Sequence, residues 1–539
     1  MEAKSLKTKI TFNAYVGEEP YLFISYSHVD TEAVYRILNR LDREKFRIWF
    51  DDTMEVGEDF REELRAKIEK CAAFVLFVSK ASMESKYCGM EIITAYKNNK
   101  KIYPIYVENG VEIPSALKLM LENLQHVNGI STDAEDKYIS KLVEGLPIEA
   151  MRSLVVKNGI LEKCKDGSKI VNIPETVLTV GKSAFKECET LEEVNISSST
   201  TSLRDEAFRG CKAIRTMHLP INIQHVGDSA FRDCVSMREL KIDNGNIEIG
   251  ERAFENCREL TSVILPEDLT EIYGGVFNSC RALKTIHLPE ELIIIGESAF
   301  AGCVSLEKIE ISDKVTKIDD MVFSGCISLK SLTLKNGLGK IGKNAFKDCK
   351  SLAKVKIPQS VYMMGTSPFR GCDGLQSITV DEKNKHFKAV DDILFNKNKS
   401  ILICYPAEKD KYEYEVPDSV TRISDWAFCE CRKLSKITIP DSVYEIGEGA
   451  FYRCTGLKYL ELPDSIERID DTAFRGCSEL ETIVIPSSVK EFGWGLLNGC
   501  EKVTVICEDG SEAAKYCDKK KIKHRENLEQ RNGMDTYSI

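Results

Sequence analysis

The chain has 539 residues, of which 43% are hydrophobic and 29% are charged, and its formal net charge is −11. This length predicts several domains with large apolar cores, and the negative charge argues against a general phosphate-binding surface, so we predict no nucleic-acid partner. No apolar run approaches the roughly 20 residues of a membrane-spanning helix, so we predict no membrane partner. Because residues 1–19 lack the apolar segment of a secretion signal, we expect a cytoplasmic protein.

Residues 20–148 alternate short apolar runs with helical stretches. The predicted strands are 21–26, 46–50, 73–79, 101–107 and, more weakly, 124–128, and the predicted helices lie near 30–42, 58–70, 86–98 and 134–146. Nearly continuous apolar strands between helices predict an α/β domain whose parallel sheet is covered on both faces. Such sheets bind ligands beyond the carboxyl ends of their strands, which points to the loops 25–30 and 50–59 and to the segment leading into residues 87–91.

Glu91 is an unusual residue for its position in the predicted helix 86–98. Cys88, Ile92 and Ala95 follow the spacing of one buried stripe. Glu91 lies three residues after Cys88, at the border of that stripe. Its carboxylate is therefore either a surface group that favours the helix dipole or an acid held at the mouth of a pocket.

Three segments of this region, in order, carry a family resemblance. They are 23-FISYSHVD-30, 49-WFDDTMEVGEDF-60 and 78-VSKASMESKYCGMEI-92, and together they resemble the TIR (Toll/interleukin-1 receptor) domain of the bacterial type. The resemblance implies a flavodoxin-like parallel sheet over residues 20–148. It also implies that TIR domains self-associate through the second segment, the BB loop, which contains Asp51, Asp52 and Gly57.

Many members of that branch cleave the nicotinamide–ribose bond of NAD⁺, which implies NAD⁺ as substrate, no cofactor and no metal. The resemblance implies that Glu91 is catalytic, that Tyr87 is a stacking platform, and that Ser25, Tyr26 and Ser27 contact the nucleotide. Nicotinamide leaves as a neutral molecule, so it needs no general acid, unlike the oxygen of a glycoside. A fixed carboxylate that stabilises the positive charge developing on the ribose suits this reaction. The alternative is a TIR domain that assembles other TIR domains without turnover.

The rest of the chain follows a 23-residue repeat. Phenylalanine recurs at positions 185, 208, 231, 254, 277, 300, 323, 346, 369, 428, 451 and 474, with Leu497 in the next position. In each unit L-x-x-I-x-I predicts a short strand, which often stops at Pro, and A-F-x-x-C predicts a short helical or 3₁₀ arc. Since so short a unit cannot bury its own apolar side chains, the coils must stack. Residues 153–525 resemble the BspA-type leucine-rich repeat family, which implies a solenoid.

Thirteen of the 20 cysteines, from Cys188 to Cys500, occupy one position of this repeat. A disulfide framework has irregular spacings that close loops, whereas this spacing is regular. Zinc is disfavoured because Cys429 and Cys431 have no second pair at ligand spacing. We therefore predict reduced thiols that pack in the core.

The register of the repeat breaks once, between Phe369 and Phe428, which are separated by more than two repeat lengths. The additional segment alternates apolar and polar residues around turn-formers and predicts a hairpin-like insertion, either structural or a ligand loop. The predicted divisions are an N-terminal extension (1–19), the TIR domain (20–148), a linker and N-terminal cap (149–180), leucine-rich repeats (181–379), the insertion (380–416), further repeats (417–507), and a C-terminal cap and tail (508–539) with an amphipathic helix within 510–528.

A TIR domain joined to a solenoid predicts a single-chain sensor and effector. In this hypothesis the repeats bind an unidentified protein or glycan, or another copy of the chain, and TIR domains then cluster and hydrolyse NAD⁺ through their raised effective concentration. Two alternatives are a non-enzymatic TIR scaffold for signalling and a secreted or injected repeat adhesin or effector. The outward strand positions are mixed in charge and show no aromatic stripe, so the sequence does not identify the ligand of the solenoid.

Overall fold

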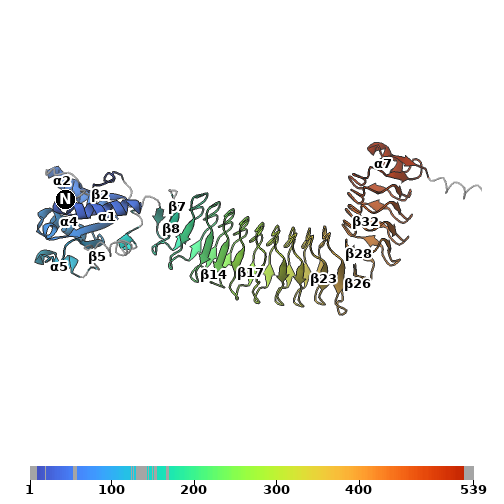
Figure 1. Cartoon of the computed structure of the whole chain (residues 1–539), viewed down its shortest axis with the longest axis horizontal. Coiled ribbons are helices and arrows are strands. Elements are labelled where there is room, and N and C mark those ends of the chain that lie inside the picture. The colour runs from blue at the N-terminus through green and yellow to red at the C-terminus, as the bar shows by residue number, and fades with distance from the viewer. Residues whose placement is uncertain are drawn as a thin grey trace, which may run out of the picture. The chain divides into compact units, whose positions relative to one another are not determined.

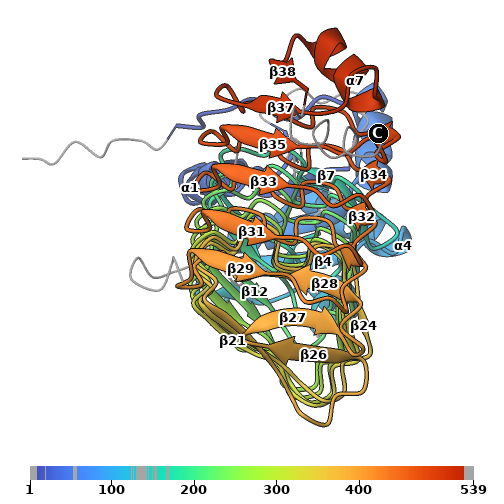
Figure 2. The same ribbon diagram turned by 90° about the vertical axis from the view of Figure 1, so that its right-hand side faces the viewer.

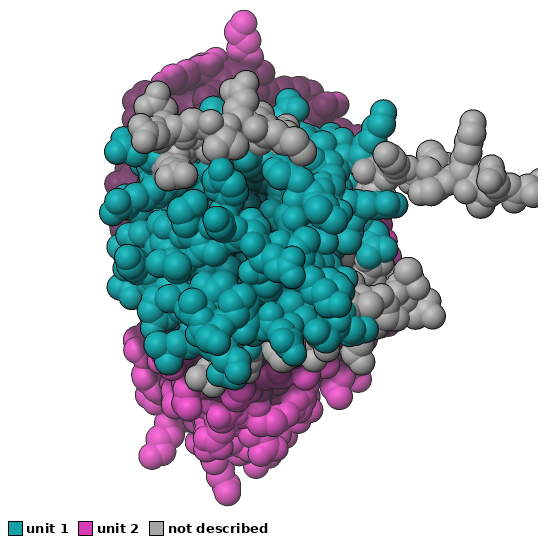
Figure 3. Space-filling model, turned by 90° about the vertical axis from the view of Figure 1, so that its left-hand side faces the viewer, with its two compact units in different colours: residues 1–185, 195–201 teal, residues 186–194, 202–539 magenta. Residues whose placement is uncertain are grey.

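The computed structural model describes residues 9–17, 20–51, 58–122, 124, 127–128, 142–143, 145–147, 150, 154–164 and 169–526. The chain divides into two compact units, residues 1–185 with 195–201 and residues 186–194 with 202–539 (Figure 3). Among the described residues, no helix has both the length and the apolar character needed to cross a bilayer.

The N-terminal domain is built on a five-stranded sheet with the order β2-β1-β3-β4-β5. Its strands are β1 (Leu22–Ser25), β2 (Ile48–Phe50), β3 (Ala73–Val78), β4 (Ile102–Tyr106) and β5 (Val127–Asn128). All four strand pairs are parallel, as predicted. In a doubly wound sheet of this order, β1 and β3 flank the switch point beyond which ligands bind.

Helices pack on both faces of this sheet (Figure 1). They are η1 (His28–Asp30), α1 (Thr31–Arg43), α2 (Glu58–Lys70), α3 (Lys80–Glu84), α4 (Lys86–Lys97) and α5 (Ser115–Leu121). Alternate residues of β3 enter separate apolar cores, Val75 and Phe77 on one face and Phe74 and Leu76 on the other. The predicted helix 134–146 lies mostly outside the described residues. The pattern did not predict α3 and α5, which are too short to show a helical period.

Most coils of the repeat region contribute a longer and a shorter strand to two parallel ladders (Figures 1 and 2). In one coil the longer strand is reduced to an isolated bridge between Thr285 and Lys308. Partners lie one repeat apart, as Lys308 with Ser331 and Lys317 with Lys340. The longer strands are β8 (Ile170–Asn172), β10 (Glu193–Asn195), β12 (Thr216–Leu219), β14 (Glu239–Ile242), β16 (Ser262–Ile264), β19 (Lys308–Glu310), β21 (Ser331–Thr333), β23 (Lys354–Ile357), β25 (Ser377–Val380), β29 (Glu413–Glu415), β31 (Lys436–Thr438), β33 (Tyr459–Glu461), β35 (Thr482–Val484) and β37 (Thr504–Ile506). The shorter strands are β9 (Thr179–Val180), β11 (Ser202–Leu203), β13 (His225–Val226), β15 (Glu248–Ile249), β17 (Glu271–Ile272), β18 (Ile294–Ile295), β20 (Lys317–Ile318), β22 (Lys340–Ile341), β24 (Met363–Met364), β30 (Arg422–Ile423), β32 (Glu445–Ile446), β34 (Arg468–Ile469) and β36 (Glu491–Phe492).

The repeated phenylalanines form a stacked column inside the coils. Neighbouring rings from Phe208 to Phe369 lie 5.0 to 5.8 Å apart and nearly parallel. The arc that carries each ring is a run of turns, so the expectation of a short helical or 3₁₀ arc is wrong. The reason is that the Phe300 N–H donates to the Val322 carbonyl of the next coil (3.0 Å) instead of to its own arc.

The repeat cysteines pack beside this column, and all but Cys188 are buried. Each thiol from Cys234 to Cys372 donates to the phenylalanine carbonyl of the preceding coil, as Cys303 does to Phe277 (3.2 Å) and Cys326 to Phe300 (3.3 Å). The same carbonyl of Phe300 also accepts the N–H of Cys303 (3.2 Å). Cysteine therefore combines a small apolar volume with a weak donor, which explains why it recurs at this position.

We expect these thiols to resist alkylation while the protein is folded. Burial raises the pKa of Cys303 to about 12, so at pH 8 only about one such thiol in 10⁴ is the reactive thiolate. Iodoacetamide labelling followed by peptide mass spectrometry is expected to modify the partly exposed Cys188 long before Cys303. Equal labelling rates at the two positions in the native protein would contradict this packing.

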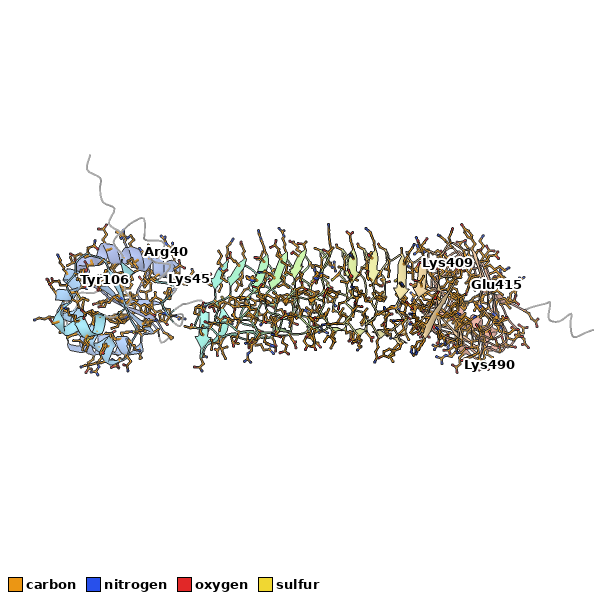
Figure 4. All side chains as sticks on the ribbon, turned by 90° about the horizontal axis from the view of Figure 1, so that it is seen from below. Arg40, Lys45, Tyr106, Lys409, Glu415 and Lys490 are labelled. Carbon is orange, nitrogen blue, oxygen red and sulfur yellow. The ribbon has the colours of Figure 1, made fainter. Side chains whose placement is uncertain are left out.

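The insertion contains a hairpin and one additional coil (Figure 2). Strands β26 (Phe387–Val390) and β27 (Ile393–Asn396) are antiparallel, and β28 (Ile401–Cys404) pairs antiparallel with β27 and parallel with β30. Tyr405 takes the phenylalanine position, because its ring stacks on Phe428 at 5.2 Å and its N–H donates to Ala427. Lys409, which is labelled in Figure 4, is only 7% exposed. Its Nζ lies 3.4 Å from Asp391 and 3.5 Å from Asp392 in the hairpin turn.

Both ends of the solenoid are covered. Strands β6 (Leu154–Lys157) and β7 (Ile160–Cys164) form an antiparallel hairpin, and β7 continues in parallel to β9. At the other end α7 (Glu512–Lys520) buries Ala513, Ala514 and Cys517, and β38 (His524–Arg525) pairs with β37. Strands β6 and β38 thus extend one ladder at each end of the solenoid, and α7 packs its apolar side chains on the last coils.

Candidate functional site

Three loops of the N-terminal domain meet where the central strands end. Ser25 is the last residue of β1, Asp51 directly follows β2, and Ser79 directly follows β3. Because these strands are adjacent and parallel, their carboxyl ends lie at one edge of the sheet. The N-terminal part of α4 contributes Glu91 to the same place.

The start of α4 fixes the position of Glu91. Ser85 caps the helix by accepting the N–H of Cys88 at 3.3 Å, and Cys88, Ile92 and Ala95 form the buried stripe that the sequence predicted. Glu91 lies beside that stripe and is partly exposed. Its Oε2 accepts a hydrogen bond of 2.5 Å from Ser25 Oγ. This contact joins helix α4 to the end of β1.

The carboxyl group of Glu91 is desolvated although part of the residue is accessible. Burial raises its pKa from 4.5 to about 7; the hydrogen bond from Ser25 lowers the pKa, and the negative charge of Asp51 raises it further. A carboxylate with so high a pKa at the switch point of an α/β sheet is typical of a functional group.

Cys88 does not provide a nucleophile at this site. It is buried, and the pKa of its thiol is raised to about 11 by burial and by the neighbouring Glu91. At neutral pH it is therefore a protonated packing residue.

Tyr26 and Ser27 follow Ser25 but differ from it in their surroundings. Tyr26 is buried against Tyr35, and its hydroxyl donates to the backbone carbonyl of Asp51 at 3.0 Å. It thus holds the ends of β1 and β2 together. Ser27 is partly exposed and precedes η1 without capping it through its side chain.

Tyr87 and Asp51 both precede Glu91 in the sequence and come from different elements. Tyr87 is 45% exposed and lies one helical turn before Glu91, with its ring accessible to a ligand. Asp51 is partly exposed and close enough for its charge to act on Glu91. Asp52 and Gly57 of the BB loop lie outside the described residues.

A second contact between motifs was not predicted. Ser79 Oγ donates to Asp30 Oδ2 at 2.5 Å, which ties the loop after β1 to the loop after β3. Ser79 also caps α3 through reciprocal bonds with Ser82. In the sequence, Asp30 ends the first motif and Ser79 lies within the third. Their contact could not be predicted without the strand order, which places the ends of β1 and β3 side by side.

Fold and site together define a repeat solenoid joined to a doubly wound α/β domain with an acidic group at its switch point. The sequence model described as "BspA type Leucine rich repeat region" matches residues 156–284, 270–401 and 408–517, and the model described as "TIR domain" matches residues 22–143. The chain belongs to the BspA-type leucine-rich repeat family and carries an N-terminal TIR domain.

Several solved bacterial structures are similar to this chain. A leucine rich cell surface protein from Faecalibacterium prausnitzii is 23% identical, with 72% of this chain and 96% of that one covered and a TM-score of 0.48. A leucine-rich repeat protein from Bacteroides ovatus is 25% identical, with 70% and 91% covered and a TM-score of 0.45. No curated protein matches the chain significantly.

Proposed function

We propose that the TIR domain hydrolyses NAD⁺ at the nicotinamide–ribose bond, with Glu91 stabilising the positive charge that develops on the ribose. A TIR domain joined to BspA-type repeats is an architecture that fits a signalling or scaffold protein. The observation that supports catalysis is the desolvated Glu91 carboxylate, held by Ser25 at the carboxyl end of β1.

The proposed reaction needs an anion that is already in place. As the bond between the ribose carbon and the nicotinamide nitrogen breaks, both electrons go to the nitrogen, which becomes neutral, and the ribose becomes cationic. Water then adds hydroxide to that carbon and releases a proton. The Glu91 carboxylate stabilises the cation without reorganisation because Ser25 fixes one of its oxygens. In this proposal the ring of Tyr87, which is exposed, stacks on the leaving group.

Nicotinamide release by the concentrated full-length protein tests this function. We expect Glu91→Gln, which keeps the size of the side chain but removes its charge, to lower kcat at least about a hundredfold. The matched control is Glu44→Gln, since Glu44 pairs with Arg40 on the surface at 3.1 Å, and it is expected to retain activity within about twofold. Equal background release from wild type and Glu91→Gln would leave only the scaffold function.

The pH dependence of NAD⁺ hydrolysis is a second test. Because the ionised form of Glu91 is the active one and its pKa is about 7, kcat/KM is expected to fall about tenfold per pH unit below 7 and to level off above it. Ser25→Ala removes the hydrogen bond that lowers this pKa. The acidic limb of the pH profile of kcat/KM should therefore move to higher pH in this variant. A profile that stays flat from pH 5 to pH 8 would rule out this role.

The repeats supply the regulation in this proposal. Ligand binding by the solenoid brings TIR domains together and raises their effective concentration, and TIR self-association then promotes hydrolysis. The proposed compartment is the cytoplasm, which contains NAD⁺ and keeps the buried thiols of the coils reduced.

A non-enzymatic scaffold is the second candidate. Tyr87 and Met90 are exposed apolar side chains on α4, and such side chains suit contact with another protein surface. In this case Met90→Glu would lower the apparent mass of concentrated protein in light scattering, and nicotinamide release would remain at background.

A further inference from the structure

The segment 335–399 differs in charge from the rest of the chain. It contains 13 lysines and arginines but six acidic residues, a net charge of +7, whereas the whole chain has a net charge of −11. A local excess of this size creates a positive surface potential that a negatively charged chain would otherwise lack.

Ion pairing increases the difference in available positive charge between this segment and the other coils. In other coils lysines pair with carboxylates of the preceding coil, as Lys212 does with Glu189 and Lys502 with Glu479, both at 2.6 Å. In the described part of the chain, by contrast, no carboxylate forms an ion pair with Lys340, Lys383 or Lys385. These cations are therefore available to a ligand.

Lys383 and Lys385 border a hollow of about 490 Å³ at the turns that follow β23 and β25. The lining residues are Gln359, Ser360, Tyr362, Lys383, Lys385 and His386. The ring of Tyr362 is 49% exposed and lies 5.8 Å from Lys340 Nζ and 6.2 Å from the ring of His386. The hollow thus presents the ring of Tyr362 and the imidazole of His386 among cationic, amide and hydroxyl groups.

A buried asparagine holds the loop that carries these cations. Asn384 is 1% exposed and occupies the position that Val361 has one coil earlier. Its amide donates to the carbonyls of Pro358 and Val361, both at 2.9 Å, and its oxygen accepts the N–H groups of His386 and Phe387, both at 2.8 Å. With four hydrogen bonds satisfied, this side chain fixes the loop on the preceding coil.

The two acidic residues of the loop do not neutralise it. Asp381 accepts the backbone N–H of Lys383 at 3.0 Å, so its carboxylate is turned toward the start of the loop. Glu382 is exposed and does not line the hollow. The groups that face the hollow are therefore neutral or cationic.

We propose that this hollow binds an acidic saccharide. One sugar ring lies on the face of Tyr362, its carboxylate or sulfate groups contact Lys340, Lys383 and Lys385, and Gln359 contacts its hydroxyl groups. A single-stranded nucleic acid fits less well, because successive bases need successive aromatic platforms, whereas the rings of Tyr362 and His386 meet edge to face at 62°. The inference deepens the proposal that the repeats bind a ligand, and it is independent of catalysis by Glu91.

Calorimetric titration of the full-length protein tests this site. The ligands are a heparin-derived octasaccharide, an oligogalacturonate of the same length, a neutral dextran oligomer and a single-stranded DNA 16-mer. At least one acidic saccharide is expected to bind, with at least about tenfold loss of affinity in Lys383→Gln/Lys385→Gln and in Tyr362→Ala, and the dextran is expected not to bind.

The matched control is Lys314→Gln/Lys330→Gln, which removes the same charge from lysines that pair with Glu291 and Glu307. It is expected to change the affinity less than about twofold, and thermal unfolding checks that every variant is folded. Absence of binding to both acidic saccharides, tighter binding of the oligonucleotide, or equal weakening by the control would overturn the proposal. Since binding is measured directly, a protein that binds the saccharide but releases no nicotinamide would refute only the enzymatic proposal.

Discussion

Replacement of Phe300 by alanine is expected to lower the free energy of unfolding of the repeat region by about 3–5 kcal/mol. The ring is fully buried and stacks on Phe277 and Phe323, each at 5.6 Å. Its loss leaves a cavity between two coil interfaces, because each coil gains its stability from its neighbours. Urea unfolding of the full-length protein measures the effect as a lower midpoint for the repeat region.

Hydrogen exchange locates the effect of Phe300→Ala. Amides of the coils around residue 300 should exchange faster, whereas β1 and β3 should be unchanged, because the TIR domain has its own cores. Tyr444→Ala is the control, since that ring is exposed, and it should cost less than about 1 kcal/mol. Uniform acceleration across both units would show that they unfold together.

Glu91→Gln is expected to stabilise the TIR domain by about 2–3 kcal/mol at pH 8. The native fold raises the pKa of Glu91 from 4.5 to about 7, so the native state binds the proton more tightly than the unfolded state does. The contribution of Glu91 to stability is thus fully present below pH 4.5 and is lost as the pH rises through 7. Glutamine, which stays neutral, avoids that loss.

Hydrogen exchange of β1 and β3, followed from pH 5 to pH 8, measures this gain. The difference in stability between Glu91→Gln and wild type should grow as the pH rises, and at pH 5 it should be less than about 1 kcal/mol. Glu44→Gln, at an exposed ion pair, should show no such gain. A destabilising effect of Glu91→Gln at pH 8 would mean that the carboxylate is a structural partner of Ser25 rather than a strained functional group.

The periodicity of the sequence determines most of the fold. In the TIR domain the strands and the helices α1, α2 and α4 lie within a few residues of their predicted bounds, because each strand is an apolar run and each of these helices is long enough to show a helical period. The turns of the repeat arcs were harder to predict, since their backbone bonds run to the next coil. The repeat pattern did not predict the coil at Tyr405, because tyrosine replaces the phenylalanine that marks every other coil before Leu497.

The contacts of the candidate site could not be predicted from the sequence as well as the fold could. The motifs identified Glu91 and Ser25 separately, but they are 66 residues apart, and the pair forms only because β1 and α4 meet at the switch point. The burial that raises the pKa of Glu91 is a property of the packed fold. In the same way, the sequence gives no sign that Asn384 is a structural residue. Its role follows from its four hydrogen bonds, which join two coils.

The column of stacked rings has a consequence for how such a chain changes its length. Each coil from Phe231 to Phe346 offers its successor a phenylalanine face and a carbonyl that accepts a thiol, and it receives the same from its predecessor. A gene segment encoding one coil can therefore be duplicated or lost without leaving a bare ring or an orphaned donor. Tandem copying would thus lengthen the solenoid by about 4.8 Å per coil, while the remaining coils keep their local contacts.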